Sequence, residues 1–270
     1  MKDYTLKYGK GSVTFALDEA HVTELYGTPV PKIDDIRAAL YATLSSPVSH
    51  EPLESWVNPE DKVALIVSDM SRFWMRQDLV VPHIISYLTD KCDVNQNNIT
   101  IIIANGTHPG GDENELRTLV TDGVYDRIRV VNHDCQAKDL VYIGTTSLGT
   151  EVRINPIAAN ADKVIMLGAC TYHVMAGYGG GRKSILPGIS GLETIRQNHL
   201  HSLDLLAPRS NPLIGNGVTD GNPLNEDMCQ AAAMVKNLFG INLVTNADMQ
   251  LAHIISGDPM KSWQLACHRV

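Results

Sequence analysis

Apolar and polar positions along the chain predict strands that alternate with helices. Four short apolar runs have the length and flanks of buried strands, at residues 62–67, 100–104, 129–132 and 163–167. Helical spacing predicts helices at residues 33–44, 79–89, 191–201 and 225–237, and another that begins near residue 112. A further strand is expected at residues 242–245, and the last residues resemble the start of a helix. This alternation is typical of an α/β fold with a mostly parallel sheet and helices on both faces.

Other segments depart from that alternation. Residues 4–17 alternate around Gly9 and Gly11 and predict a β-hairpin, and residues 141–154 predict an antiparallel excursion with turns at Gly144 and Gly149. Residues 45–61 carry three prolines without sustained periodicity, so they predict a surface connection, and residues 204–222 are rich in loop formers. We therefore expect a hairpin, a helix and a connection over residues 1–60 and an α/β core over residues 61–270.

Composition narrows the class of partner. The 270 residues carry a net charge of −8, which disfavours nucleic acid or an anionic membrane and favours a small molecule. We find neither a signal-peptide pattern nor an apolar run of membrane-spanning length. The five cysteines are widely spaced and lack a C-x-x-C pair, so we expect reduced thiols in a cytoplasmic protein.

Polar side chains follow three of the predicted strands. They are, in chain order, Asp69 and Arg72, then Asn105 and His108, then Tyr172, His173 and Lys183. The carboxyl ends of parallel strands lie at one edge of the sheet, where open α/β sheets bind ligands. These residues are therefore expected to line one crevice.

The third of these loops is rich in glycine and reads ACTYHVMAGYGGGRKSILPGI. Glycines let a backbone approach a bound group closely, as in loops that hold phosphates. Arg182 stands immediately before Lys183, where a P-loop needs glycine, and the third glycine of a dinucleotide-binding loop is missing. A plain glycine-rich turn, with Lys183 as a surface or phosphate-binding lysine, remains an alternative on these residues alone.

Several ordered blocks resemble a known family. The blocks are SDMSR, NGTHP, VVNHD with LVYIGTTSLGTEVRIN, YHVMAGYGGGRKSILPGISGLETIRQNH and GNPLNEDM. Together they resemble the amino-terminal domain of the nickel-pincer lactate racemase family. The resemblance implies a racemase or epimerase that interconverts stereoisomers of a 2-hydroxy acid. It also implies a nickel-pincer nucleotide, a pyridinium-3-thioamide-5-thiocarboxylic acid mononucleotide that holds nickel.

The same resemblance implies roles for individual residues. Lys183 corresponds to the lysine bonded covalently to the cofactor, and His199 to the protein ligand of nickel. His108 and His173 correspond to the paired acid/base histidines, and Arg72 to a substrate-binding residue. The remaining cofactor-pocket residues are Asp69, Gly179, Gly180, Gly181 and Arg182. His201 is an alternative metal ligand, and Arg72 could instead pair with Asp69 at a spacing of three residues.

The resemblance also concerns partners. Members of the family continue into a second α/β domain, so we expect a C-terminal domain in cis or in trans and enzymes that make the cofactor. Phe73, Trp74 and the residues around His108 differ from the pattern associated with lactate, which leaves another 2-hydroxy acid open. Alternatives are a half-enzyme that needs a separate C-terminal domain and a non-catalytic mononucleotide-binding domain. A hydrolase is disfavoured because the chain lacks a nucleophile-elbow sequence.

Overall fold

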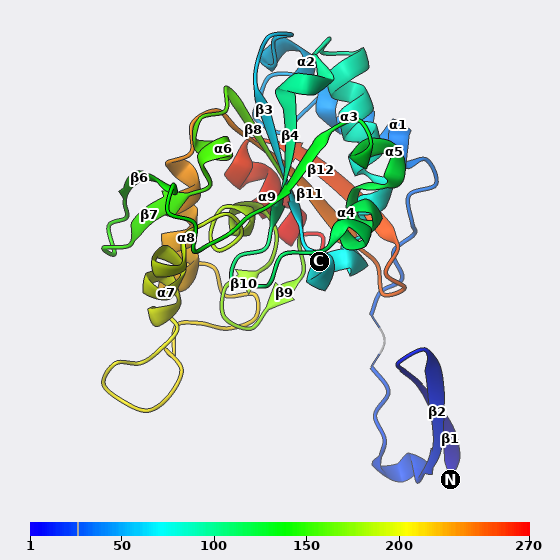
Figure 1. Cartoon of the computed structure of the whole chain (residues 1–270). Coiled ribbons are helices and arrows are strands. Elements are labelled where there is room, and N and C mark those ends of the chain that lie inside the picture. The colour runs from blue at the N-terminus through cyan, green and yellow to red at the C-terminus, as the bar shows by residue number, and fades with distance from the viewer. Residues whose placement is uncertain (26) are drawn as a thin grey trace. The chain divides into compact units, whose positions relative to one another are not determined.

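The computed structural model describes residues 1–25 and 27–270, which divide into two units at residue 30. The first unit contains the antiparallel strands β1 (Lys2–Tyr8) and β2 (Gly11–Leu17), followed by a short 3-10 helix, Glu19–His21 (Figure 1). Gly9 adopts a positive φ of 56° in the turn between the strands, a conformation that glycine adopts without strain. The predicted N-terminal hairpin is thus confirmed.

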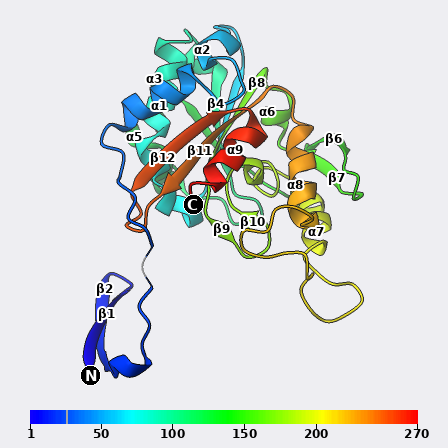
Figure 2. The same cartoon turned by 180° about the vertical axis from the view of Figure 1, so that it is seen from behind.

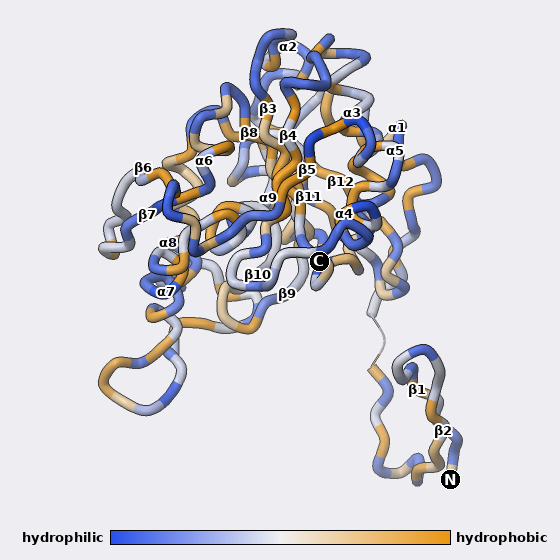
Figure 3. The backbone as a smooth tube through the Cα atoms, in the orientation of Figure 1, coloured by the Kyte–Doolittle hydropathy of each residue, from blue (hydrophilic) through white to orange (hydrophobic). Residues whose placement is uncertain are grey.

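The second unit is built on a six-stranded sheet. In spatial order its strands are β12 (Leu251–Gly257), β11 (Leu238–Thr245), β8 (Lys163–Ala169), β3 (Val63–Ser68), β4 (Ile99–Ala104) and β5 (Arg129–Asn132). The last five run parallel to one another, and β12 pairs antiparallel with β11. These strands form the most continuous apolar region at the centre of Figure 3. The mostly parallel sheet agrees with the prediction.

Helices cover both faces of this sheet (Figures 1 and 2). One core contains side chains of α1 (Ile36–Ser45), α2 (Leu53–Trp56), α3 (Val81–Asp90), α4 (Glu113–Val120) and α5 (Asp122–Tyr125). The other contains side chains of α6 (Pro156–Ala159), α7 (Leu192–Leu200) and α8 (Pro223–Ala233). Successive residues of β3 enter opposite cores, Leu65 the first and Ile66 the second, because side chains alternate along a strand. A smaller cluster forms around Trp263 of α9 (Pro259–Cys267).

Two small antiparallel pairs complete the second unit. The predicted excursion consists of β6 (Val141–Thr145) and β7 (Glu151–Ile154). A second pair, β9 (Tyr172–His173) and β10 (Gly177–Tyr178), lies within the glycine-rich loop and was not predicted. In the described part of the chain, no helix combines the length and the apolar character needed to cross a bilayer.

Several boundaries differ from the sequence-based expectation. The helix expected to reach residue 237 ends at Ala233, and Asn237 then adopts a positive φ of 48°, so β11 begins at Leu238 rather than at residue 242. Strand β12 was not predicted, although it pairs with six residues of β11. Helix α1, which had been grouped with the hairpin, buries Leu40 and Leu44 in the first core and belongs to the second unit.

Candidate functional site

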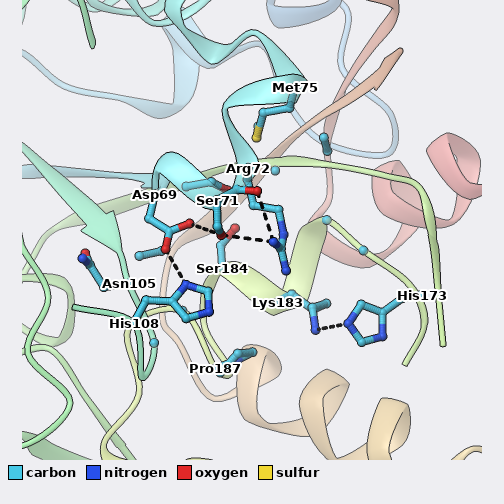
Figure 4. Close-up of a pocket in the computed structure, with 18 of the residues that line it drawn as sticks. Asp69, Ser71, Arg72, Met75, Asn105, His108, His173, Lys183, Ser184 and Pro187 are labelled. Carbon is cyan, nitrogen blue, oxygen red and sulfur yellow. Dashed lines mark hydrogen bonds and ion pairs between the residues drawn. The ribbon is translucent and has the colours of Figure 1, made fainter. Parts of the chain in front are cut away.

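The loops that follow β3, β4 and β8 meet at one cavity of about 220 Å³, at the carboxyl edge of the sheet. Seven of the residues singled out from sequence for the site line it: Asp69, Arg72, His108, His173, Gly179, Gly180 and Lys183. His199 reaches the same cavity from α7. Figure 4 shows the loop residues directed toward one another. Arg182 and Gly181 do not line the cavity and are described below.

Asp69 and His108 form a pair across two loops. Asp69 directly follows β3, and its largely buried carboxylate accepts a hydrogen bond from the Ser71 hydroxyl at 2.6 Å. Its second oxygen lies 2.5 Å from Nδ1 of His108 (Figure 4). A carboxylate on Nδ1 holds the proton there and leaves the Nε2 lone pair available. Asp69 therefore orients His108 in the protein itself, a role that the motif alone did not indicate.

Arg72 leaves Asp69 free for that role. Its guanidinium donates to the carbonyl and the hydroxyl of Ser71, at 3.3 and 3.1 Å, rather than to Asp69. The expected alternative, an ion pair between Asp69 and Arg72, is therefore not formed. The Arg72 side chain is exposed and lines the cavity, where a planar guanidinium can bind a carboxylate through two hydrogen bonds.

His173 is held by the backbone of its own loop. Its Nδ1 accepts hydrogen bonds from the backbone N–H groups of Met175 and Ala176, at 3.2 and 3.1 Å. In the neutral ring the proton therefore lies on Nε2, which is 3.3 Å from Nζ of Lys183. A hydrogen bond from Nε2–H to Nζ requires a lone pair on the nitrogen. The geometry thus favours an uncharged Lys183 amine.

Electrostatics support the same protonation states. Burial, with the nearby guanidinium groups of Arg182 and Arg72, lowers the pKa of Lys183 to about 7. Burial, with the charges of Lys183 and Arg72, lowers the pKa of His173 to about 4. At neutral pH His173 is therefore uncharged, and a substantial fraction of Lys183 is a free amine, the nucleophilic form.

We expect Lys183 to react with acetic anhydride at half its maximal rate near pH 7, because only the neutral amine reacts and its pKa is lowered to about 7. The reaction rate should rise as pH increases through that value. Quantitative peptide mass spectrometry across a pH series measures it, with the urea-unfolded chain as the reference, in which lysine has its ordinary pKa of about 10.4. A folded protein that reproduced the midpoint of the unfolded chain would contradict the expectation.

His199 presents one nitrogen to the cavity. Its Nδ1 lies 2.9 Å from the carbonyl oxygen of Ile195, one turn earlier in α7, so Nδ1 carries the proton and Nε2 keeps its lone pair. Such a bond commonly orients a metal-binding histidine. Burial and the neighbouring Lys183 lower the pKa of His199, which keeps the ring neutral. Among residues 1–25 and 27–270, no three His, Cys, Asp or Glu side chains converge as a metal-binding group.

A buried carboxylate holds α7 in place. Asp227 of α8 is fully buried and accepts hydrogen bonds from the hydroxyls of Thr146 and Thr150 and from the amide of Asn198, the neighbour of His199. His201, the alternative metal ligand, does not line the cavity and has its Nε2 3.9 Å from this carboxylate. The structure therefore favours His199 over His201 as a donor toward the cavity.

Arg182 supports the glycine-rich loop from behind. Its side chain is fully buried and donates to the carbonyl oxygens of Ala176, Gly179 and Gly180 and to the side-chain oxygen of Asn225. The guanidinium also lies 3.8 Å from the ring centre of Trp263. Burial lowers the pKa of Arg182 to about 10, so it stays charged at neutral pH. The structure thus places Arg182 in the core, and not in the cofactor pocket where the family motif suggested it.

Two glycines of the loop have no room for a side chain. A Cβ on Gly180 would lie 2.9 Å from Sγ of Cys170, and one on Gly181 would lie 2.7 Å from the Trp263 ring. Both residues also have positive φ, which glycine adopts without strain. Gly179 and Gly180 line the cavity, whereas Gly181 packs against Trp263.

Sequence reasoning missed several hydroxyl residues that line the cavity, among them Ser71 and Ser184. Ser71 contacts both Asp69 and Arg72, and Ser184 directly follows Lys183. Both lie inside motif blocks that had been singled out, so their position beside charged residues was the available signal. Their distance from the reacting groups could not be inferred without the fold.

The chain is similar in sequence to a known family and to two lactate racemases. Residues 8–209 match the sequence profile of the lactate racemase N-terminal domain family. The lactate racemase of Thermoanaerobacterium thermosaccharolyticum is 26% identical over 279 residues, covering 100% of this chain and 62% of that protein. The lactate racemase of Lactiplantibacillus plantarum is 27% identical over 267 residues, covering 97% of this chain and 61% of that protein.

Two solved structures share the fold. The apoprotein of the T. thermosaccharolyticum lactate racemase superimposes with a TM-score of 0.87 at 24% identity, covering 99% of this chain and 62% of that one. A protein from Thermotoga maritima gives a TM-score of 0.65 at 18% identity, covering 87% of this chain and 57% of that one. The chain therefore spans about 62% of the length of the T. thermosaccharolyticum relative.

Proposed function

The chain belongs to the lactate racemase N-terminal domain family, and on this premise we propose that it is the catalytic part of a 2-hydroxy acid racemase or epimerase. The observation that carries the proposal is the convergence of His108, His173, Lys183, His199 and Arg72 on one cavity. These groups come from four separate segments of the chain. Together they offer two bases, a nucleophilic amine, a metal donor and a carboxylate-binding cation.

The proposed reaction avoids a carbanion. The α-hydrogen of a hydroxycarboxylate is barely acidic, because its loss as a proton would place negative charge beside an existing carboxylate. Loss as hydride gives a planar 2-keto acid instead, to which hydride can return on either face. A nickel-pincer pyridinium mononucleotide, when bound, would supply the hydride acceptor.

The residues that are present fit such a group. The Lys183 amine, which is buried and partly uncharged at neutral pH, suits covalent attachment. His199 directs a free Nε2 toward the cavity, as a single protein ligand of nickel would. Gly179 and Gly180 bring backbone to the cavity wall without side chains. We therefore assign Lys183 to covalent attachment, His199 to the metal, and these two glycines to contact with the mononucleotide.

Two histidines are needed because two stereoisomers place their hydroxyl groups on opposite sides. His108 reaches the cavity from the loop after β4 and His173 from the loop after β8, and we assign each to one stereoisomer. For His173 to act as a base, its ring proton must move from Nε2 to Nδ1, with loss of the two backbone hydrogen bonds at Nδ1. The Asp69–His108 bond leaves Nε2 of His108 able to take the hydroxyl proton. Arg72 would bind the substrate carboxylate and fix the orientation of the α-carbon.

Attachment at Lys183 would also prepare His173. In the present arrangement Nε2 of His173 is bonded to the Lys183 nitrogen, and the charge of Lys183 is a cause of its lowered pKa. A thioamide nitrogen is uncharged and accepts hydrogen bonds poorly. Formation of the bond would therefore free the Nε2–H group and remove one charge that lowers the pKa of His173, while burial, the main cause of the lowered pKa, would remain.

The proposal includes partners. Because the relatives are longer, we propose that activity needs a C-terminal domain, in cis or in trans, in addition to this α/β core. The substrate is a small 2-hydroxy acid, and cofactor-making enzymes are required. We place the reaction in the cytoplasm on the basis of the sequence.

The test is the intact mass of protein produced together with the cofactor-making enzymes. The wild-type chain is expected to carry a mononucleotide adduct, and the Lys183→Ala variant is expected to lose it completely, because no other amine lies at that position. Lys91→Ala, which removes an exposed lysine, is the matched control and should keep the adduct. An unmodified wild-type mass under these conditions, or an adduct that persists in Lys183→Ala, would count against the proposal.

A non-catalytic mononucleotide-binding role is the second candidate. It is favoured by the backbone of Gly179 and Gly180, which lines the cavity and could contact a phosphate. Calorimetric titration of the chain with nucleoside monophosphates, without nickel, separates the two. Saturable binding without any adduct at Lys183 would favour this candidate.

A further inference from the structure

The N-terminal hairpin places its large apolar side chains on one face. Residues paired across the two strands share a face, because opposite side chains of an antiparallel pair point the same way. The hairpin apolar face, as we define it, consists of Tyr4, Leu6, Tyr8, Val13, Phe15 and Leu17. The other face carries the pairs Asp3–Ala16, Thr5–Thr14 and Lys7–Ser12.

Within the first unit, the hairpin apolar face is only partly covered. Exposed fractions are 59% for Leu6, 76% for Tyr8, 45% for Val13, 37% for Phe15 and 41% for Leu17. The opposite face satisfies its polar groups locally, as in the 2.8 Å bond between Thr5 and Thr14. An isolated two-stranded hairpin is marginally stable in water, and an apolar face opposite a polar one is typical of a strand pair that packs on a core.

The comparisons indicate what supplies that core. The T. thermosaccharolyticum lactate racemase matches 100% of this chain with only 62% of its own length, so it carries a large further region. Its solved structure superimposes on 99% of this chain, which extends the shared fold into the hairpin. The relatives thus combine this hairpin with a region that is not part of the present sequence.

We propose that the hairpin apolar face is a docking surface for the further region that the lactate racemase relatives carry, present in cis or as a separate chain. The six side chains of the face are uncharged, and the charge of Lys2 at its end is paired with Glu24 at 2.6 Å, so the partner surface must be mainly apolar. A region on the same chain meets the face at high effective concentration, which a second copy cannot match at low protein concentration. The inference rests on family membership and deepens the proposed need for a C-terminal domain.

Hydrogen exchange of the hairpin amides tests this docking. We compare the present chain with a fusion in which Val270 is followed by the unmatched region of the T. thermosaccharolyticum lactate racemase. Amide exchange in residues 2–17 is expected to slow at least about tenfold in the fusion, because a covered hairpin opens less often. The chain alone is expected to show fast exchange there at all protein concentrations.

Variants locate the effect on the face. The substitutions Leu6→Ser and Val13→Ser, made together in the fusion, should abolish the slowing, since they remove one apolar cross-strand pair from the docking surface. The pair Thr5→Ser and Thr14→Ser is the matched control on the opposite face and should leave the slowing intact. Equal slowing in both double variants would overturn the assignment of this face.

Other outcomes also decide the question. Fast exchange in the hairpin of a fusion whose added region is folded would overturn the proposal, as would concentration-dependent protection of the chain alone through a dimer. If the added region does not fold on this chain, the same comparison is made with the T. thermosaccharolyticum lactate racemase itself. Its intact chain then replaces the fusion, and its chain truncated at the position aligned with Val270 replaces the present chain. Unchanged protection of its hairpin after truncation would then overturn the proposal. Neither nickel nor substrate is present, so the result is independent of the adduct experiment at Lys183.

Discussion

Asp69→Asn is expected to lower the rate of 2-hydroxy acid racemisation by about 10⁴-fold in the cofactor-loaded protein combined with its C-terminal domain, as replacement of a carboxylate that orients a catalytic histidine does elsewhere. In the wild-type site the carboxylate holds the His108 proton on Nδ1 and leaves Nε2 free to accept a proton. An asparagine amide can donate to Nδ1 instead, which moves the ring proton to Nε2. His108 would then be unable to act as a base at neutral pH.

The tautomer can be measured without cofactor or substrate. Nitrogen NMR of the selectively labelled protein should show the His108 proton on Nδ1 in the wild type and a large shift toward Nε2 in Asp69→Asn. Ser71→Ala is the control, because it removes a hydrogen bond to the other carboxylate oxygen and leaves the contact with His108. Its rate should fall less than about tenfold, the smaller loss expected when the neutral donor is removed. Full activity of Asp69→Asn, or an unchanged tautomer, would refute the orienting role.

The fold was predictable where burial leaves a simple pattern. The first five residues of β3, VALIV, are all apolar because both faces of a central parallel strand are covered, and such runs stand out from sequence. Strand β12 could not be recognised from sequence, because its middle residues are only partly buried and His253 interrupts the apolar pattern. Strand β11 starts before the predicted residue 242 and contains Gly240, a residue type that is rare in strands. The structure requires glycine at this position, because a Cβ would lie 2.9 Å from Oγ of Ser262.

The site was predictable as a set of loops and not as a set of contacts. The parallel strands place the loops that carry Asp69, His108 and Lys183 at one edge of the sheet. This placement follows from the topology alone and does not depend on side-chain conformation. The bond between Asp69 and His108 joins residues 39 positions apart, and the sequence separation carries no signal for it. The different positions of Arg182 and Lys183 could not be predicted either, because adjacent basic residues in a loop are usually exposed. Only the fold shows that Arg182 is buried in the core while Lys183 lines the cavity.

Arg182→Lys is expected to lower the free energy of unfolding by about 2 to 4 kcal/mol, because each buried acceptor left without its donor costs about 1 to 3 kcal/mol and lysine can satisfy only part of the set. The guanidinium bonds simultaneously to three carbonyl oxygens and to Asn225, and it stacks on Trp263. A lysine ammonium is a compact donor that cannot reproduce this planar set of bonds, so buried acceptors lose their partners. The carbonyls left without partners belong to the loop that carries Gly179 and Gly180.

Urea unfolding followed by circular dichroism measures this loss. Arg196→Lys, on the exposed side of α7, is the matched control and should change the free energy of unfolding by less than about 0.5 kcal/mol. Because the glycine-rich loop positions Lys183, the Arg182→Lys protein should also lose the half-maximal reactivity of Lys183 near pH 7 under conditions where it remains folded. An Arg182→Lys protein as stable as the Arg196→Lys control would show that the loop does not depend on the buried guanidinium.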